Sequence, residues 1–311
     1  MIRELCTGAA WLALAAPAMA EQAPMCEREL VVLGAGQDAG APQIGNGDDG
    51  KPRLLPSSLA LIDRASGKRY LFDATPAITE QLAALDAIEP PKAGLGIDGI
   101  FLTHAHIGHY LGLAWLGREA AGAKEVPVYT MPRMAEFLRS NGPWSQLVEL
   151  GNIELRRVGD QAITSLDLGR LRVMPYIVPH RDEYSETAGF MFFAGRKSVH
   201  YIPDIDSWTH FTYGDHSALF EIIKSGRLLF IDATFWDDNE LPGRDMSEIP
   251  HPRVKSTMDM LQHLPPEERA KVHFIHYNHT NPIRDPASAE SREVAERGFG
   301  VAREGDRFCL D

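Results

Sequence analysis

Short apolar runs alternate with amphipathic stretches along most of this chain. Runs of β-branched and other apolar residues predict buried strands, and apolar residues at helical spacing predict helices. Strands are expected at 29–33, 59–62, 70–72, 99–102, 128–130, 153–158, 171–178, 189–193, 198–202, 228–231 and 272–275. Helices are expected at 78–88, 110–121, 218–224, 252–264 and 286–297, with one more ending before 141. This order predicts an α/β protein whose sheets are covered by helices.

A glycine-rich loop follows the first predicted strand. Gly34, Gly36 and Gly40 miss the spacing of a dinucleotide-binding loop, because position 39 is Ala39. No helical pattern follows, since Pro42 and further glycines intervene. A Rossmann-type nucleotide site is therefore not expected.

The first twenty residues have the pattern of a secretory signal. A short apolar run at 9–16 is followed by the small residues Ala18 and Ala20, which match a cleavage site. The alternative is a buried N-terminal helix. The run is too short to span a bilayer, and no later stretch predicts a membrane helix. We therefore expect a signal peptide at 1–20, a single domain at 21–311, and a periplasmic or secreted protein without a membrane anchor.

The charge balance limits the class of partner. The formal net charge is -12, and removal of residues 1–20 leaves it unchanged, because Arg3 and Glu4 cancel. An acidic chain has no excess of cations for a phosphate backbone, so a nucleic-acid partner is not expected. A small-molecule substrate is the expected partner, and the sequence does not specify an oligomeric state.

Two cysteines remain after the signal segment, Cys26 and Cys309, near the two ends of the mature chain. Cysteines usually pair in an oxidising compartment, and chain termini often lie close together. A disulfide is therefore reasonable, and two unrelated free thiols are an equal alternative.

Three histidines follow the predicted strand at 99–102. They are His104, His106 and His109 in the segment Thr-His-Ala-His-Ile-Gly-His. Imidazole is the commonest protein ligand for zinc and similar ions, and alternating residues in a loop can face one metal. The pattern therefore predicts a metal site, and scattered surface histidines are the alternative interpretation.

This segment resembles the His-x-His-x-Asp-His motif of the metallo-β-lactamase superfamily. Four more residues match the superfamily's marks in order, each after a predicted strand: Asp73, His180, Asp204 and His276. The resemblance covers nearly the whole mature chain. It implies a four-layer αβ/βα sandwich, with two mixed sheets packed face to face and helices outside.

Within this superfamily, the loops at 37–43, 178–183 and 280–282 resemble the coenzyme PQQ synthesis protein B group. That group carries a cysteine cluster after the glycine loop, whereas residues 44–49 of this chain contain no cysteine. The metal motif also differs, because Gly108 stands where the superfamily has an aspartate. We interpret the chain as a relative of that group.

The resemblance also assigns metal ligands. It implies that His104, His106 and His180 bind one ion and that His109 and His276 bind a second. Asp204 would bridge the two ions, and Asp73 would orient a ligand histidine. One or two zinc ions are expected, with iron or manganese as alternatives at the second position. Gly108 removes a carboxylate from that second position.

Further residues are candidates for catalysis and substrate binding. His251 resembles the additional histidine of the phosphodiesterase branch and could act as a general acid, with a solvated loop histidine as the alternative. Asp204 could hold a hydroxide and accept its proton. His279 could be a rival ligand or a substrate contact. Tyr184, Trp236 and Arg244 lie in predicted loops and could line the pocket.

These residues favour a metal-dependent hydrolase acting on a small ester, lactam or phosphodiester. Two alternatives remain open. One is a non-haem iron oxygenase related to PQQ biosynthesis, suggested by a site of two histidines and one carboxylate. The other is a non-catalytic protein that binds a metal or ligand.

Overall fold

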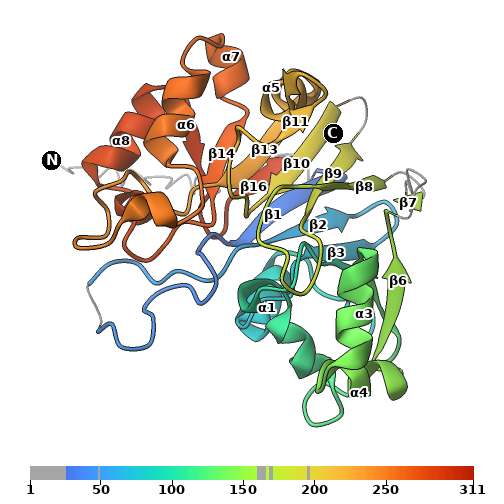
Figure 1. Cartoon of the computed structure of the whole chain (residues 1–311). Helices are drawn as coiled ribbons and strands as arrows, with labels where there is room; N and C mark the ends of the chain where they lie inside the picture. The colour runs from blue at the N-terminus through green and yellow to red at the C-terminus, as the bar shows by residue number, and fades with distance from the viewer. Residues whose placement is uncertain (1–25, 48–49, 160–165, 168–170, 195–196) are drawn as a thin grey trace, which may run out of the picture.

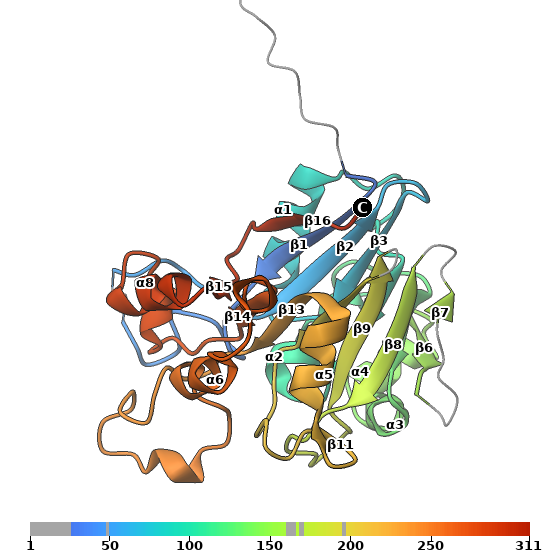
Figure 2. The same cartoon turned by 90° about the horizontal axis from the view of Figure 1, so that it is seen from above.

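Two β-sheets pack face to face in the computed structural model, with helices on both outer faces (Figure 1). The structure describes residues 26–311 except 48–49, 160–165, 168–170 and 195–196. The predicted signal peptide lies outside the described residues. Figure 1 shows the layers, with α5 (Ala218–Ser225) above and α1 (Ile78–Ile88) below the pair of sheets, and Figure 2 shows the same molecule from above.

In the described part of the chain, the first sheet has the strand order β16-β1-β2-β3-β4-β5-β6. Strands β3, β4, β5 and β6 are parallel, whereas β16, β1, β2 and β3 pair antiparallel. The strands are β1 (Arg28–Gly34), β2 (Ser58–Asp63), β3 (Lys68–Phe72), β4 (Gly99–Phe101), β5 (Val126–Thr130), β6 (Ile153–Arg157) and β16 (Arg307–Cys309).

The second sheet has the order β15-β14-β13-β10-β9-β8-β7 among the described residues. Here β10, β13, β14 and β15 are parallel, and β7 to β10 form an antiparallel meander. The strands are β7 (Leu166–Asp167), β8 (Arg172–Ile177), β9 (Ala188–Ala194), β10 (Lys197–Ile202), β13 (Gly226–Asp232), β14 (Val272–Ile275) and β15 (Gly300–Val301). A small hairpin, β11 (Thr212–Tyr213) and β12 (His216–Ser217), precedes α5.

Two groups of helices cover the outer faces. Beside the first sheet lie α1, α2 (Ile107–Tyr110), α3 (Pro132–Ser140) and α4 (Trp144–Glu149). Beside the second sheet lie α5, α6 (Val254–Leu261), α7 (Pro266–Arg269) and α8 (Ala289–Glu296). Short 3-10 turns occur at Leu111–Leu116, Met246–Glu248 and Pro282–Arg284. None of the helices in the described residues is long and apolar enough to cross a membrane.

The alternation of side chains along each strand produces two cores. In β1, Leu30 and Val32 face the second sheet, while Val31 and Leu33 pack beneath the helices of the first sheet. Because both faces are covered, the strand is apolar at every buried position. Between the sheets, the ring of Phe72 in β3 lies 4.8 Å from that of Phe192 in β9, so aromatic contacts join the two layers.

The predicted helix at 110–121 is wrong. The chain instead forms the single α-turn α2 and then the 3-10 turn at Leu111–Leu116. Gly112 explains the difference, because its N–H donates to Ala74 O at 2.9 Å and an added Cβ would lie 2.1 Å from Thr75 O. This close approach draws the turn onto the loop after β3. The other helices and strands predicted in the described residues are present with small shifts at their ends.

Cys26 and Cys309 form a disulfide, with their Cα atoms 5.5 Å apart. The bond joins the residues before β1 to β16, which pairs antiparallel with β1. Figure 2 shows the C-terminus beside these two strands. Of the two alternatives that the sequence leaves open, the structure contains the disulfide.

Candidate metal centre

Most of the predicted metal-site residues lie just beyond the carboxyl ends of strands. Asp73 follows β3, His104 follows β4, Asp204 follows β10 and His276 follows β14. Because β3 and β4 are parallel, as are β10 and β14 with β13 between them, their carboxyl ends lie at one edge of each sheet. The two edges meet, which brings residues from distant parts of the sequence into one centre.

One group of ligand atoms lies around Asp204. His104, His106, His180 and Asp204 each offer an atom within 4.8 Å of the others. Asp204 Oδ2 lies 3.3 Å from His104 Nε2, 3.1 Å from His180 Nε2 and 3.8 Å from His106 Nδ1. Three imidazoles and a carboxylate are a donor set that suits zinc.

A second group of ligand atoms also approaches Asp204. His109 Nε2 and His276 Nε2 are each 4.0 Å from Asp204 Oδ2. The third residue of this group is Asp38, whose carboxylate lies within 4.8 Å of a ring nitrogen of each histidine. Both groups therefore approach the same oxygen of Asp204, as is expected for a bridging carboxylate.

Buried nitrogen atoms without partners test whether this centre fits a metal. His109 and His276 are 1% and 0% exposed, and the Nε2 atom of each has no hydrogen-bond partner among the described residues. A buried polar atom without a partner costs about 1–3 kcal/mol. A cation between the two rings and Asp204 would satisfy both atoms, so the residues fit a bound metal ion.

Asp73 holds two of the histidines in place. Its Oδ2 accepts a hydrogen bond from His109 Nδ1 at 2.8 Å, and its Oδ1 accepts from Thr103 Oγ1 at 2.9 Å. Thr103 Oγ1 in turn lies 3.0 Å from His104 Nδ1. Tyr201 also donates to Asp73 Oδ2 at 3.2 Å. The carboxylate thus orients His109 directly and His104 through Thr103, with each Nε2 atom aimed at the centre.

Comparable partners on the opposite side were missed by the sequence analysis. Asp206 Oδ1 accepts from His180 Nδ1 at 2.7 Å. Thr234 Oγ1 lies 3.1 Å from His276 Nδ1 and donates to Asp232 Oδ1 at 2.8 Å. Two features of the sequence could have identified these partners. Asp232 directly follows a predicted strand, and Asp206 lies two residues after Asp204.

His251 is part of the centre and is not a solvated loop histidine. It is 9% exposed, and its Nδ1 atom lies 2.8 Å from Asp232 Oδ2 and 3.2 Å from Asp204 Oδ1. Burial alone would lower its pKa, but Asp232 and then Asp204 outweigh this and raise the pKa to about 9. His251 is therefore held in its protonated form beside Asp204.

The pKa values of three ligand histidines differ according to their surroundings. Burial lowers the pKa of His104 and of His276 well below the ordinary value. For His109, burial is outweighed by Asp73, which raises the pKa to about 9. Burial would raise the pKa of Asp204, but the facing histidines, His251 first, hold it well below the ordinary value. Asp204 is thus an anion, as a bridging ligand must be.

The backbone is strained at this centre. Asp38, Asp73, His251 and His276 all have positive φ, at 39°, 66°, 102° and 64°. Non-glycine residues rarely adopt this region, and such strain gathers at functional sites. Each of the four side chains belongs to the groups described above, which is consistent with a functional centre at these strand ends.

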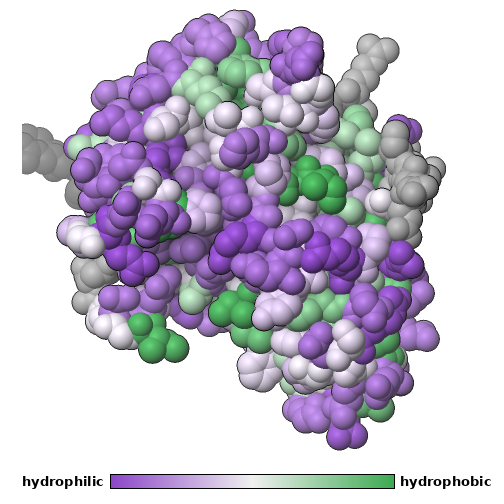
Figure 3. Space-filling view, in the orientation of Figure 1, coloured by the Kyte–Doolittle hydropathy of each residue, from purple (hydrophilic) through white to green (hydrophobic). Residues whose placement is uncertain are grey.

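A pocket of about 670 Å³ adjoins the second group. It is lined by Asp38, Arg244 and His279 together with Gln37, Ala39, Gln43, Ile44, Leu241, Pro242 and Asn278. His279 thus lines the pocket, and among the described residues it belongs neither to the two groups above nor to the cluster of Asp204, Asp232 and His251. Of the three residues predicted to line the pocket, Arg244 does so. Trp236 is instead buried in the core, and Tyr184 packs on Phe137. Hydrophilic residues gather across the middle of the face shown in Figure 3.

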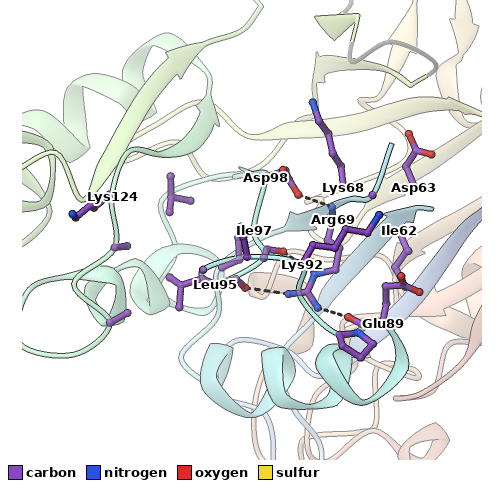
Figure 4. A pocket seen from close by; sticks show the side chains of 18 of the residues that line it. Ile62, Asp63, Lys68, Arg69, Glu89, Lys92, Leu95, Ile97, Asp98 and Lys124 are labelled. Carbon is purple, nitrogen blue, oxygen red and sulfur yellow. Dashed lines mark hydrogen bonds between the residues drawn. The ribbon is translucent and has the colours of Figure 1, made fainter. Parts of the chain in front are cut away.

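Another cavity, of about 550 Å³, lies at the opposite ends of β3 and β4 (Figure 4). Lys68, Lys92 and Lys124 line it, and Arg69 crosses its wall. The Arg69 guanidinium donates to Leu95 O, Gly96 O and Glu89 O and pairs with Asp86. Because none of its lining residues belongs to the histidine groups, this cavity is separate from the metal centre.

The family model described as beta-lactamase superfamily domain matches residues 68–277, which include most of these residues. The chain belongs to this superfamily. Coenzyme PQQ synthesis protein B of Ruegeria pomeroyi is 28% identical over 91% of the chain and 100% of that protein. The protein of the same name from Xanthomonas euvesicatoria is 27% identical over 90% of this chain and 99% of that protein.

Solved structures of the superfamily share the fold. Zinc-bound PqqB from Methylobacterium extorquens has a TM-score of 0.72 and 21% identity, covering 90% of this chain and 99% of that one. A diphosphatase of the PhnP family has a TM-score of 0.62 and 23% identity, covering 90% and 96%. The predicted superfamily, its sandwich fold and the likeness to PqqB are confirmed.

Proposed function

We propose that this chain is a metal-dependent hydrolase in which water attacks a small ester, lactam or phosphodiester. The observation that carries the proposal is the position of Asp204. Its Oδ2 atom lies within 4.0 Å of a ring nitrogen of five histidines, three from the first group and two from the second. One carboxylate oxygen shared by two sets of imidazoles supports a centre for two cations with Asp204 as their bridge.

The residues of the centre would hold two cations and activate a water molecule. His104, His106 and His180 would hold the first cation, and His109 and His276 would hold the second. A bound divalent cation lowers the pKa of a water molecule toward neutrality and polarises the group under attack. Asp204, an anion between the two sets, would orient that water and accept its proton.

His251 would serve as the general acid. Its Nδ1 atom is bonded to Asp232 Oδ2, so Nε2 is the nitrogen left to face the substrate. Because burial beside Asp232 and Asp204 keeps the ring protonated, it can donate a proton to the leaving group as the bond breaks. This role favours a substrate with a poor leaving group, such as an alkoxide from an ester or phosphodiester.

The adjoining pocket fits a small molecule, because its volume of about 670 Å³ lies in the range of small-ligand sites. Arg244 and His279 in its wall favour an anionic or strongly polar group, which again suits a phosphodiester. Export to the periplasm or beyond is part of the proposal. The disulfide between Cys26 and Cys309 supports it, since disulfides persist in oxidising compartments.

The test is a hydrolysis screen with zinc-loaded and manganese-loaded protein. Chromogenic phosphodiesters, esters, lactones and cephalosporins would be compared for the wild type, His104→Ala and His251→Gln. We expect turnover of at least one class, lost in His104→Ala and reduced about 100-fold or more in His251→Gln. If the wild type hydrolyses no substrate, the proposal is contradicted and a non-catalytic binding protein is favoured. If hydrolysis is unchanged in His104→Ala, the activity does not come from this metal centre and the proposal is also contradicted.

A metal-dependent oxygenase is the second candidate function. Its support is the set of two histidines and one carboxylate formed by His109, His276 and Asp204, which is a set that non-haem iron uses. The chain is also similar to coenzyme PQQ synthesis protein B along 91% of its length. Metal analysis of protein purified without added metal separates the two candidates. Iron with oxygen-dependent turnover of an organic substrate supports the oxygenase, whereas zinc with oxygen-independent hydrolysis supports the hydrolase.

A further inference from the structure

The second group of ligands differs from the superfamily motif at one position. The motif carries an aspartate immediately before its last histidine, and this chain has Gly108 there. With His109 and His276 alone, this side of the centre would rely entirely on Asp204 for negative charge. The structure, however, places a different carboxylate beside these histidines.

That carboxylate is Asp38, from the glycine-rich loop after β1. A Cβ atom added to Gly108 would lie 2.9 Å from Asp38 Oδ1 and 2.5 Å from Asp38 Cα. Asp38 therefore occupies the space that a side chain at position 108 would need. Its carboxylate lies within 4.8 Å of ligand atoms of both His109 and His276.

The loop is fixed to the strand end that carries His276. Gln37 N donates to Tyr277 O at 3.1 Å, and Tyr277 N donates to Ala35 O at 3.0 Å. Tyr277 directly follows His276, so both backbone bonds are made by the residue next to the ligand histidine. Gln37 Nε2 also donates to Asp38 Oδ2 at 3.1 Å, which leaves Oδ1 as the oxygen nearest Gly108.

We propose that Asp38 is a ligand of the second cation and replaces the carboxylate that Gly108 removes. The Nε2 atoms of His109 and His276 are buried and have no hydrogen-bond partner in the part of the chain that the structure describes, so a ligand-binding position lies between them and Asp38. Asp38, His109 and His276 form a set of two imidazoles and one carboxylate, and Asp204 is within reach of both rings. This donor set suits zinc, manganese or iron.

Gly108 and Asp38 depend on each other in this arrangement. Only glycine at 108 leaves room for the Asp38 backbone, and Asp38 supplies a charge that glycine cannot. The inference rests on the metal binding assumed in the proposed function, but it does not depend on hydrolysis. Its test is therefore a count of bound ions and needs no substrate.

The experiment measures zinc content and zinc affinity after chelation and reloading. Wild-type protein is expected to bind two Zn²⁺ per chain by mass spectrometry and calorimetry. In Asp38→Ala and the isosteric Asp38→Asn, the first equivalent should remain and the second should bind more than about 100-fold more weakly. This loss would exceed the 10–100-fold fall in metal affinity that follows when a residue that only orients a ligand is replaced. The matched control is Asp215→Ala, an exposed aspartate between β11 and β12, which should bind two ions.

Gly108→Ala provides an independent arm that keeps every ligand group. Its Cβ would meet the Asp38 backbone, so we expect the loop to move and the second equivalent to weaken. Gly142→Ala is the control, since a Cβ there meets none of the described residues within 4 Å. Retention of the first equivalent shows that the variants fold.

If Asp38→Ala binds two Zn²⁺ with unchanged affinity, or if the wild type binds only one Zn²⁺, the proposed role of Asp38 is overturned. Either result leaves the first metal position intact. A wild type that binds no Zn²⁺ would overturn both this inference and the proposed function.

Discussion

Asp73 Oδ2 lies 2.8 Å from His109 Nδ1, and both side chains are almost completely buried. The same carboxylate binds Thr103, which contacts His104, so one residue orients a histidine from each metal group. Asp73 is placed by the end of β3 and reaches the histidines through a backbone with positive φ. It is therefore a positioning residue for the whole centre.

Replacing Asp73 with asparagine should weaken metal binding without removing a ligand. The neutral amide binds His109 and Thr103 less strongly, so the rings lose orientation and basicity. We expect metal affinity to fall 10–100-fold, measured by competition with a chromogenic chelator. Asp215→Asn serves as the control on the surface. An unchanged affinity in Asp73→Asn would show that the histidines do not depend on this carboxylate.

Removal of metal should destabilise the fold. In the chelated protein, the buried Nε2 atoms of His109 and His276 lie beside the buried Asp204 and find no hydrogen-bond partner among the residues that the structure describes. A ligand present at about 1,000 times its Kd stabilises the folded state by about 4 kcal/mol. We therefore expect a chelator to lower Tm by several degrees, measured by differential scanning fluorimetry, and added zinc to restore it. In His104→Ala the decrease should be smaller.

Much of the fold and most of the centre could be predicted from the sequence. Asp73, His104, Asp204 and His276 each follow an apolar run that becomes a strand, and the resemblance to the superfamily motif identified them. Their convergence follows from the parallel pairing of those strands. The helix at 110–121 was predicted wrongly, because its apolar pattern ignores the contact between Gly112 and the loop after β3.

Other parts of the centre depend on contacts that no local pattern encodes. Asp38 lies in a loop that showed an imperfect nucleotide motif and a resemblance to the PQQ synthesis protein B group, and neither pattern marked Asp38 as a ligand. Backbone bonds to Tyr277 bring it beside His276. Asp206 and Asp232 are ordinary acidic residues until the fold sets them against His180 and His251. Tertiary packing therefore decides which carboxylates act on the metal ligands.

Loss of the disulfide should lower stability without disturbing the metal centre. The bond between Cys26 and Cys309 closes nearly the entire described chain, with a sequence separation of 283 residues. Because a long closed loop restricts the unfolded chain, we expect Cys26→Ser with Cys309→Ser to reduce the free energy of unfolding by about 2–4 kcal/mol. Denaturant titration measures this change. Zinc content should stay at the wild-type value, and its loss would indicate that the disulfide supports the site.

The Asp232–His251 pair should set the basic limb of the pH–rate profile. A general acid must be protonated, and burial beside Asp232 and Asp204 gives His251 a pKa of about 9. Activity that needs this proton should therefore be retained at neutral pH and fall as the pH rises through about 9. The same raised pKa adds stability that is complete below about 6.5 and is lost as the pH rises toward 9.

Asp232→Asn separates this role of His251 from a purely structural one. The variant removes the first of the two carboxylates that raise the pKa of His251, and an opposite charge at this distance shifts a pKa by about 1–3 units. We expect the basic limb of kcat to move to lower pH by about one unit or more, while zinc content is unchanged. His251→Gln should lose the limb together with most of kcat. A basic limb that stays near pH 9 in Asp232→Asn would assign it to another group, because His251 could not keep its pKa without Asp232.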